Sequence, residues 1–103
     1  MPLIVLAEAR IDPAQLDTVR AIARPMIEAS RAEPGCLAYD FAIDLIDPGV
    51  LRVCERWRNA EALKDHFTTP HMAAFAKALH GLSAKTIELK CYELGSEQRM
   101  PGR

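Results

Sequence analysis

Three side chains in the middle of the sequence have the chemistry of proton transfer: Glu55, His66 and His71. Glu55 alternates with the apolar residues Val53 and Trp57 in a strand-like stretch, so burial should partly desolvate its carboxylate and raise its pKa. An imidazole, with an unperturbed pKa of about 6.5, can accept or donate a proton near neutrality. The three groups are therefore the candidate catalytic residues for a substrate that must lose a proton.

The two histidines are expected at the junction of two short helices. His66 falls near the end of the first and His71 near the start of the second, so they could converge on one pocket mouth. The alternative is that each caps or braces the helix pair, and this fits His66 better than His71. A spacing of five does not suit one helical face and no third ligand is evident nearby, so we predict no metal site. His80, beside Gly81, is expected to offset a helix dipole.

Large apolar and aromatic side chains flank these groups. Six of them are predicted to line a substrate pocket: Trp57, Tyr39, Phe41, Phe67, Met72 and Phe75. Trp57 could stack on a ring, and the Tyr39 hydroxyl could donate to a substrate oxygen. Core packing is the alternative role for the six. For Glu55 the alternative is a buried structural ion pair with Arg56, Arg58 or a helix residue.

The pattern of apolar residues predicts the elements that would position this site. Strands are expected at residues 3–11, 36–46, 50–58 and 84–94. Helices are expected from 13 to about 32, from 60 to 67 and from 70 to about 80, with Asp12, Asn59 and Thr69 as N-caps. Pro25 lies inside the first helix and lacks a backbone donor, which predicts a kink, a shortened helix or two short helices.

This order of elements is that of a ferredoxin-like, split βαβ unit of the α+β class, with a four-stranded antiparallel sheet. Alternation in the strands puts Tyr39, Phe41, Val53 and Trp57 on one face of the sheet. The opposite face is predicted to carry Ile4, Leu6, Ala38, Ala42, Cys54, Ile87, Leu89 and Cys91. Because both faces would be apolar, we expect a second copy of the chain to cover the free one in a homodimer.

Length and composition narrow the class of protein. With 103 residues, the chain fits one domain (residues 1–95) with a flexible tail (residues 96–103). Its net charge of -1 gives no positive electrostatic field that would attract nucleic acid or an anionic membrane. No apolar run is long enough to span a bilayer. Three separated cysteines, Cys36, Cys54 and Cys91, are interpreted as reduced core residues, which predicts a cytoplasmic location. No glycine-rich phosphate loop or ligand cluster is present, so no cofactor is expected.

Three segments carry a family resemblance: residues 33–39 (EPGCLAY), 55–57 (ERW) and 66–72 (HFTTPHM). Together they resemble the antibiotic-biosynthesis-monooxygenase domains, and residues 3–8 and 66–75 are most similar to the quinol monooxygenase branch. The resemblance implies a dimeric α+β barrel with a pocket between the sheet and the helices of each subunit. It also implies oxidation of polycyclic phenols or quinols by dioxygen, without flavin, haem or metal.

Other functions are compatible with the same fold. Some related proteins isomerise or process small phosphorylated signalling sugars and share a His-x-x-Thr-Pro-His stretch, which would make Glu55, His66 and His71 proton shuttles. Haem degradation is disfavoured because related proteins use an asparagine on the first strand, where this chain has Ala7 and Glu8. A non-catalytic dimeric module that binds a hydrophobic ligand is the remaining alternative.

Overall fold

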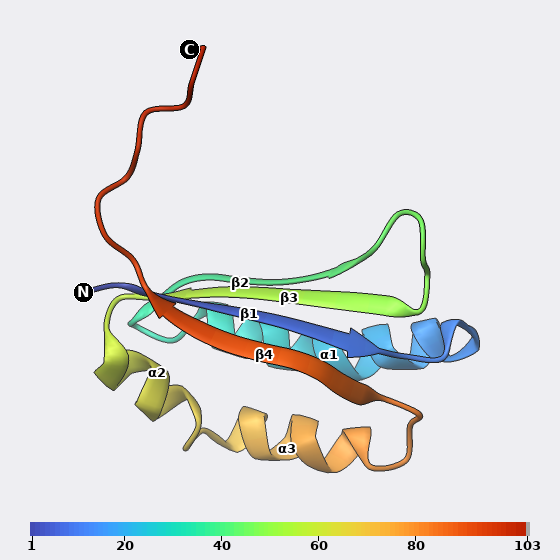
Figure 1. Cartoon of the computed structure of the whole chain (residues 1–103). Coiled ribbons are helices and arrows are strands. Elements are labelled where there is room, and N and C mark those ends of the chain that lie inside the picture. The colour runs from blue at the N-terminus through green and yellow to red at the C-terminus, as the bar shows by residue number, and fades with distance from the viewer. Residues whose placement is uncertain (103) are drawn as a thin grey trace.

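The computed structural model describes residues 1–102 as a single sheet with helices between its strands (Figure 1). The elements, in chain order, are β1 (Leu3–Arg10), the 3-10 turn η1 (Pro13–Gln15), α1 (Leu16–Arg31), β2 (Cys36–Ile43), β3 (Val50–Trp57), α2 (Ala60–His66), α3 (Pro70–Leu79) and β4 (Lys85–Glu93). Residues 94–102 form no strand or helix and lead away from the sheet. No helix within residues 1–102 is both long and apolar enough to cross a membrane.

The sheet is antiparallel throughout, with the strand order β2-β3-β1-β4. All three α-helices lie on one face of it, and no helix of the described residues covers the other (Figure 1). This confirms the predicted α+β, ferredoxin-like architecture. The strand order leaves β2 and β4 as the two edges, and only the β2 side is closely covered by α1.

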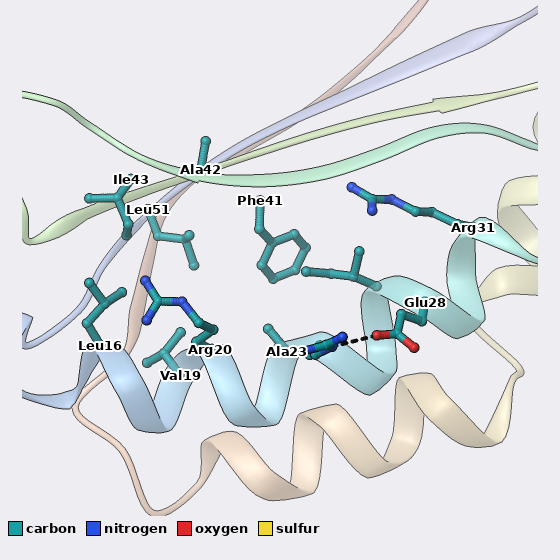
Figure 2. Close-up of a pocket in the computed structure, with 12 residues that line it drawn as sticks. Leu16, Val19, Arg20, Ala23, Glu28, Arg31, Phe41, Ala42, Ile43 and Leu51 are labelled. Carbon is teal, nitrogen blue, oxygen red and sulfur yellow. Dashed lines mark hydrogen bonds and ion pairs between the residues drawn. The ribbon is translucent and has the colours of Figure 1, made fainter.

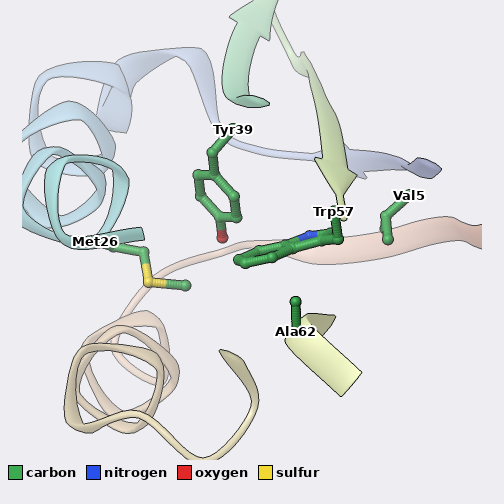
Figure 3. Packing of buried hydrophobic residues seen from close by; sticks show 5 residues of the cluster. All are labelled: Val5, Met26, Tyr39, Trp57 and Ala62. Atoms are coloured by element: carbon green, nitrogen blue, oxygen red, sulfur yellow. The ribbon is translucent and has the colours of Figure 1, made fainter. Parts of the chain in front are cut away.

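The core between sheet and helices consists of two clusters. Around Trp57, which is fully buried, pack Val5, Met26, Tyr39 and Ala62 (Figure 3). Toward the other end of β3, a smaller cluster joins Ile11, Val19 and Leu51. The core therefore has a bulky aromatic end and an end built from smaller aliphatic side chains.

Two boundaries differ from the sequence-based expectation. Helix α1 runs unbroken from Leu16 to Arg31, so a helix shortened or split at Pro25 was a wrong prediction. Strand β2 ends at Ile43 rather than at residue 46. The Asp44 carboxylate accepts hydrogen bonds from the N–H groups of Ile46 (3.0 Å) and Asp47 (2.8 Å), and this local turn competes with continued strand pairing.

The face predicted for β4 also needs correction. Leu89 pairs opposite Ala7 and Cys91 opposite Val5, so both side chains belong to the helix-covered face, not to the face that carries Ile4 and Leu6. The face that a side chain takes depends on how its strand pairs with the next one, and alternation within one strand cannot predict this pairing. The helices nevertheless leave every residue of β4 exposed.

Candidate active site

The junction of α2 and α3 is built by short polar side chains. Asn59 caps α2 by accepting from the Ala62 N–H at 2.9 Å. Thr69 joins the two helices, because its hydroxyl donates to the His66 carbonyl (2.8 Å) and accepts from the Met72 N–H (3.3 Å). These bonds place His66 on the last turn of α2 and His71 on the first turn of α3. Their rings lie 6.0 Å apart, as the predicted convergence of the two histidines requires.

A third element, the turn after α1, brings Glu33 to the same place. The Glu33 N–H donates to the Ser30 carbonyl, and the Glu33 carbonyl accepts from the Cys36 N–H. Gly35 lies so close to α2 that a Cβ added there would stand 2.2 Å from the Cβ of Ala62. Only glycine allows this approach, which holds the turn against the helix that carries His66.

Glu33 contacts both histidines through a single carboxylate oxygen. Its Oε2 lies 2.7 Å from Nδ1 of His66 and 2.8 Å from Nε2 of His71. The His66 side chain is 1% exposed, whereas that of His71 is 20% exposed. The three side chains, from three separate segments, therefore form a hydrogen-bonded cluster that is sealed on the His66 side and open on the His71 side.

Glu55 lies on the same side of the sheet as this cluster. Its Oε1 accepts a hydrogen bond of 2.9 Å from Nε1 of Trp57, so its near partner is the indole and not the Arg56 or Arg58 side chain considered from the sequence. Burial raises the pKa of Glu55 above its ordinary value, as predicted, while the bond from Trp57 and the nearby His66 oppose that rise. Glu55 is thus a partly desolvated carboxyl group within the electrostatic reach of His66.

Aromatic rings enclose His66. Its centroid lies 4.6 Å from the Trp57 ring, 5.3 Å from Tyr39 and 5.7 Å from Phe67, distances typical of packed aromatic pairs. Tyr39 is a core residue, and burial raises the pKa of its phenol. The Ser30 side chain opposes that rise in pKa.

The other residues predicted to line the substrate pocket differ in how deeply they are buried. Phe41, Met72 and Phe75 are partly buried against the Trp57 cluster, and the rings of Phe41 and Phe75 meet edge to face at 5.8 Å. Phe67 is 60% exposed, so it lies at the protein surface beside the histidines and does not enclose a pocket.

A cavity that could hold a small molecule is separate from the histidines. It is an open groove of about 580 Å³ between α1 and the edge strand β2 (Figure 2). Short and aliphatic side chains such as Ala23, Ile27 and Leu51 line it, and Arg20 and Arg31 extend beside Phe41. Of the predicted site residues, only Phe41 borders this groove.

Sequence reasoning did not identify Glu33 as a site residue, although it begins the EPGCLAY segment. It contacts His66 and His71 across 33 and 38 positions, and no local periodicity reports such a distance. The residue type was the available signal, since an acidic residue at a turn is a possible partner for a histidine. Arg20 and Arg31, which line the groove, were also missed, because charged residues spaced along one side of α1 are typical of any solvated helix face.

The cluster of Glu33, His66 and His71 also bears on metal binding. One ligand atom from each residue lies within 4.8 Å of the others, so a third ligand is present, contrary to the sequence-based argument. Two imidazoles and a carboxylate are a donor set that zinc or another divalent transition ion accepts. Here, however, both ring nitrogens lie at hydrogen-bond distance from one oxygen, so hydrogen bonds alone account for the convergence.

Comparison with known proteins adds the family. The model of the family described as antibiotic biosynthesis monooxygenase matches residues 2–78. The structure of a "putative antibiotic biosynthesis monooxygenase" from Deinococcus radiodurans superposes with a TM-score of 0.87 at 26% identity, covering 97% of this chain and 99% of that one.

Two of the relatives illustrate the similarity in sequence. The uncharacterized protein sll1783 of Synechocystis is 33% identical over 96% of this chain and 67% of its own length. The Mycobacterium tuberculosis protein named "Putative monooxygenase Rv0793" is 37% identical over 68% of each chain. Its solved structure has a TM-score of 0.82 at 28% identity and covers 96% of this chain and all of that one. This chain therefore belongs to the antibiotic biosynthesis monooxygenase family.

Proposed function

We propose that the protein is a cofactor-independent monooxygenase that oxidises a small aromatic, quinol-type substrate with dioxygen. The observation that carries the proposal is the cluster of proton-accepting groups, Glu33, His66, His71 and the partly desolvated Glu55, set among aromatic rings. Such an arrangement suits removal of a proton from a phenolic hydroxyl, and membership of the family makes oxygen transfer the expected outcome.

In this reaction the substrate supplies the electrons. A base removes the phenolic proton, and the electron-rich anion passes one electron to dioxygen. The resulting radicals combine to form a carbon–oxygen bond in a peroxide. Its O–O bond then breaks, leaving one oxygen atom on the ring while the other leaves as water. A hydroquinone would thereby become a hydroxyquinone, with two hydrogen atoms lost to that water. The protein contributes desolvation, orientation and the base.

We assign substrate binding to the groove between α1 and β2. Its volume of about 580 Å³ falls in the range of small-molecule sites, and its lining is mainly apolar. Phe41 links the groove to the cluster, since its ring packs at 5.6 Å against Tyr39, which in turn packs against His66. An aromatic substrate beside Phe41 would thus enter next to the rings that surround the histidines.

The direct test is oxygen uptake by protein treated with a chelator and supplied with hydroquinones, naphthols and anthrones. The unmodified protein should exceed the rate of autoxidation in buffer, and Glu55→Gln and His71→Ala should lose that excess. His80→Ala is the matched control, because His80 is exposed at the end of α3 and should leave the rate unchanged. A folded protein that gives no excess uptake with any substrate would contradict the proposal.

We also propose a cytoplasmic homodimer. On the sheet face that no helix of residues 1–102 covers, the Leu6 and Tyr92 side chains are 43% and 48% exposed. A second copy packed on this surface would remove an apolar area that monomers seldom expose. Light scattering after size exclusion should give twice the mass of the chain, and Leu6→Glu should reduce it. A monomer over the micromolar range would contradict the dimer.

A further inference from the structure

We propose that Glu33 is a positioning residue that fixes the tautomers of both histidines and leaves Nδ1 of His71 as the proton acceptor. The first half concerns hydrogen bonding in the protein itself. The second half rests on the proposed function, because it states which group takes the substrate proton.

The argument begins with what each atom can donate or accept. An ionised carboxylate has no hydrogen and can only accept hydrogen bonds. Since Oε2 of Glu33 lies 2.7 Å from Nδ1 of His66 and 2.8 Å from Nε2 of His71, both nitrogens must carry the hydrogen of the bond. In its neutral form an imidazole has one N–H and one lone pair. The lone pairs are therefore on Nε2 of His66 and Nδ1 of His71.

The two histidines also differ in how far their side chains are buried. His66 is 1% exposed and lies among the rings of Trp57, Tyr39 and Phe67. His71 is 20% exposed, so a substrate that arrives from solvent can reach this ring with less rearrangement. The geometry thus makes His71 the better candidate for proton transfer and His66 the buried partner that holds the other side of Glu33.

The backbone makes Glu33 suitable for this role. Its turn is tied at both ends, by the bond from its N–H to Ser30 and by the bond from the Cys36 N–H to its carbonyl. The Arg58 N–H donates to the Gly35 carbonyl at 2.8 Å and fixes the turn to the start of α2. A carboxylate held in this way orients a histidine as the aspartate does in a serine protease triad, by setting the tautomer and the ring direction.

The same bonds distinguish this role from metal binding. A metal ion at the cluster would need lone pairs on the two nitrogens that face Glu33. Positioning by Glu33 instead puts hydrogens on them. Tight metal binding and the proposed tautomers are therefore mutually exclusive arrangements of the same three side chains.

The test is a long-range proton–nitrogen NMR spectrum of the imidazole rings, in which a nitrogen that carries hydrogen and one with a lone pair resonate far apart. The sequence has only three histidines, and each can be assigned by substitution. We expect an N–H at Nδ1 of His66 and at Nε2 of His71. The opposite tautomer at either residue in the unmodified protein would overturn the proposal.

Two variants separate positioning from simple bracing. Glu33→Gln keeps a carbonyl acceptor and should preserve both tautomers, whereas Glu33→Met removes the acceptor and should let His71 exchange between tautomers. Glu61→Gln is the control, since it removes an exposed acid from the nearby helix α2. Unchanged tautomers in a folded Glu33→Met protein would overturn the role of Glu33. If that variant does not fold, the tautomers of the unmodified protein decide the matter.

Two further readouts complete the design. When chelator-treated protein is titrated with Zn²⁺ or Co²⁺, we expect no tight binding of one ion per chain. Tight one-to-one binding that is lost in His71→Gln would overturn the proposal. With an active substrate, His71→Gln keeps a donor to Glu33 but lacks the accepting nitrogen, so kcat should fall at least about 100-fold while KM changes little. If no substrate is turned over, the proposed function fails, while the NMR result still tests Glu33.

Discussion

The two ends of the helix-covered sheet face have opposite properties. At the Trp57 end, aromatic rings fill the space and hold four titratable side chains, with His66 and Trp57 fully buried. At the Leu51 end, smaller side chains leave the open groove of about 580 Å³, but there is no comparable cluster of bases in it. The proton-accepting groups and the groove therefore occupy separate but adjoining regions, and Phe41 lies where the two regions meet.

This separation has a physical reason. Buried polar groups are tolerable only when their hydrogen bonds are satisfied, so the cluster needs a tightly packed surrounding that fixes every partner. A binding groove needs space, which short side chains such as Ala23 and Ala42 provide. Changes at the closed end should therefore affect stability strongly, while changes at the open end should affect binding with little effect on stability.

The largest effect is expected from Trp57→Ala. It removes a fully buried ring from the core and leaves Glu55 without its hydrogen-bond donor. The free energy of unfolding should fall by about 3–5 kcal/mol, as for other large core truncations. Urea unfolding followed by circular dichroism measures this. A loss below about 1 kcal/mol would show that the closed end is not tightly packed.

Gly35→Ala should disturb the position of Glu33 without touching any titratable group. The added methyl group would stand 2.2 Å from Cβ of Ala62, so the turn and α2 must separate, at a cost of roughly 1–3 kcal/mol. Gly81→Ala is the matched control, because no atom lies within 4 Å of its added Cβ. Equal stability of the two variants would refute the close contact.

Thr69→Val tests the link between α2 and α3. It removes the bond to the His66 carbonyl and the N-cap of α3, and caps of this kind contribute about 1 kcal/mol. Thr68→Val is a useful comparison, since the Thr68 hydroxyl bonds only backward, to the Asp65 carbonyl. Thermal unfolding should show a lower Tm for Thr69→Val than for Thr68→Val, and the reverse order would contradict the proposed link.

The pH dependence of stability should report the burial of Glu55. Its pKa is raised above the ordinary 4.5 in the native protein, so folding favours its protonated form. The resulting stabilisation is complete below about pH 4.5 and is lost as the pH rises through the native pKa. Glu55→Gln cannot ionise and should become more stable relative to the unmodified protein as the pH rises from 4 to 7. A stability difference that does not vary with pH would contradict this.

The smallest effect is expected at the open end. Arg24 pairs with Glu28 at 2.7 Å on the exposed side of α1, and such solvated pairs contribute little to folding. Arg24→Ala should leave urea unfolding unchanged within error. A clear loss of stability would mean that the groove is more closely packed than the structure shows.

The architecture was largely predictable because it depends on local patterns. Alternation in residues 36–43 and 50–57 gave the hairpin, and the capping residues Asn59 and Thr69 marked the starts of α2 and α3. The pattern failed where local chemistry competed with it, at the Asp44 turn, and where a register had to be known, at β4. The helix-breaking effect of Pro25 was overestimated, because the packing of α1 against the sheet outweighs one missing backbone hydrogen bond.

The site was predictable in part. The meeting of His66 and His71 followed from two adjacent helix ends, and the raised pKa of Glu55 followed from its apolar neighbours. Glu33 and the groove depend on contacts between segments distant in sequence, which the types and spacing of residues do not encode directly.

The central claim, oxygen transfer to an aromatic substrate by this chain, is tested most directly with oxygen-18 gas. Chelator-treated protein would be given the best quinol or naphthol found by oxygen uptake, and the product would be analysed by mass spectrometry. The account predicts one labelled oxygen atom in the product, with formation lost in His71→Gln and retained in His80→Ala. An unlabelled product, or labelling that is unchanged in His71→Gln, would contradict it.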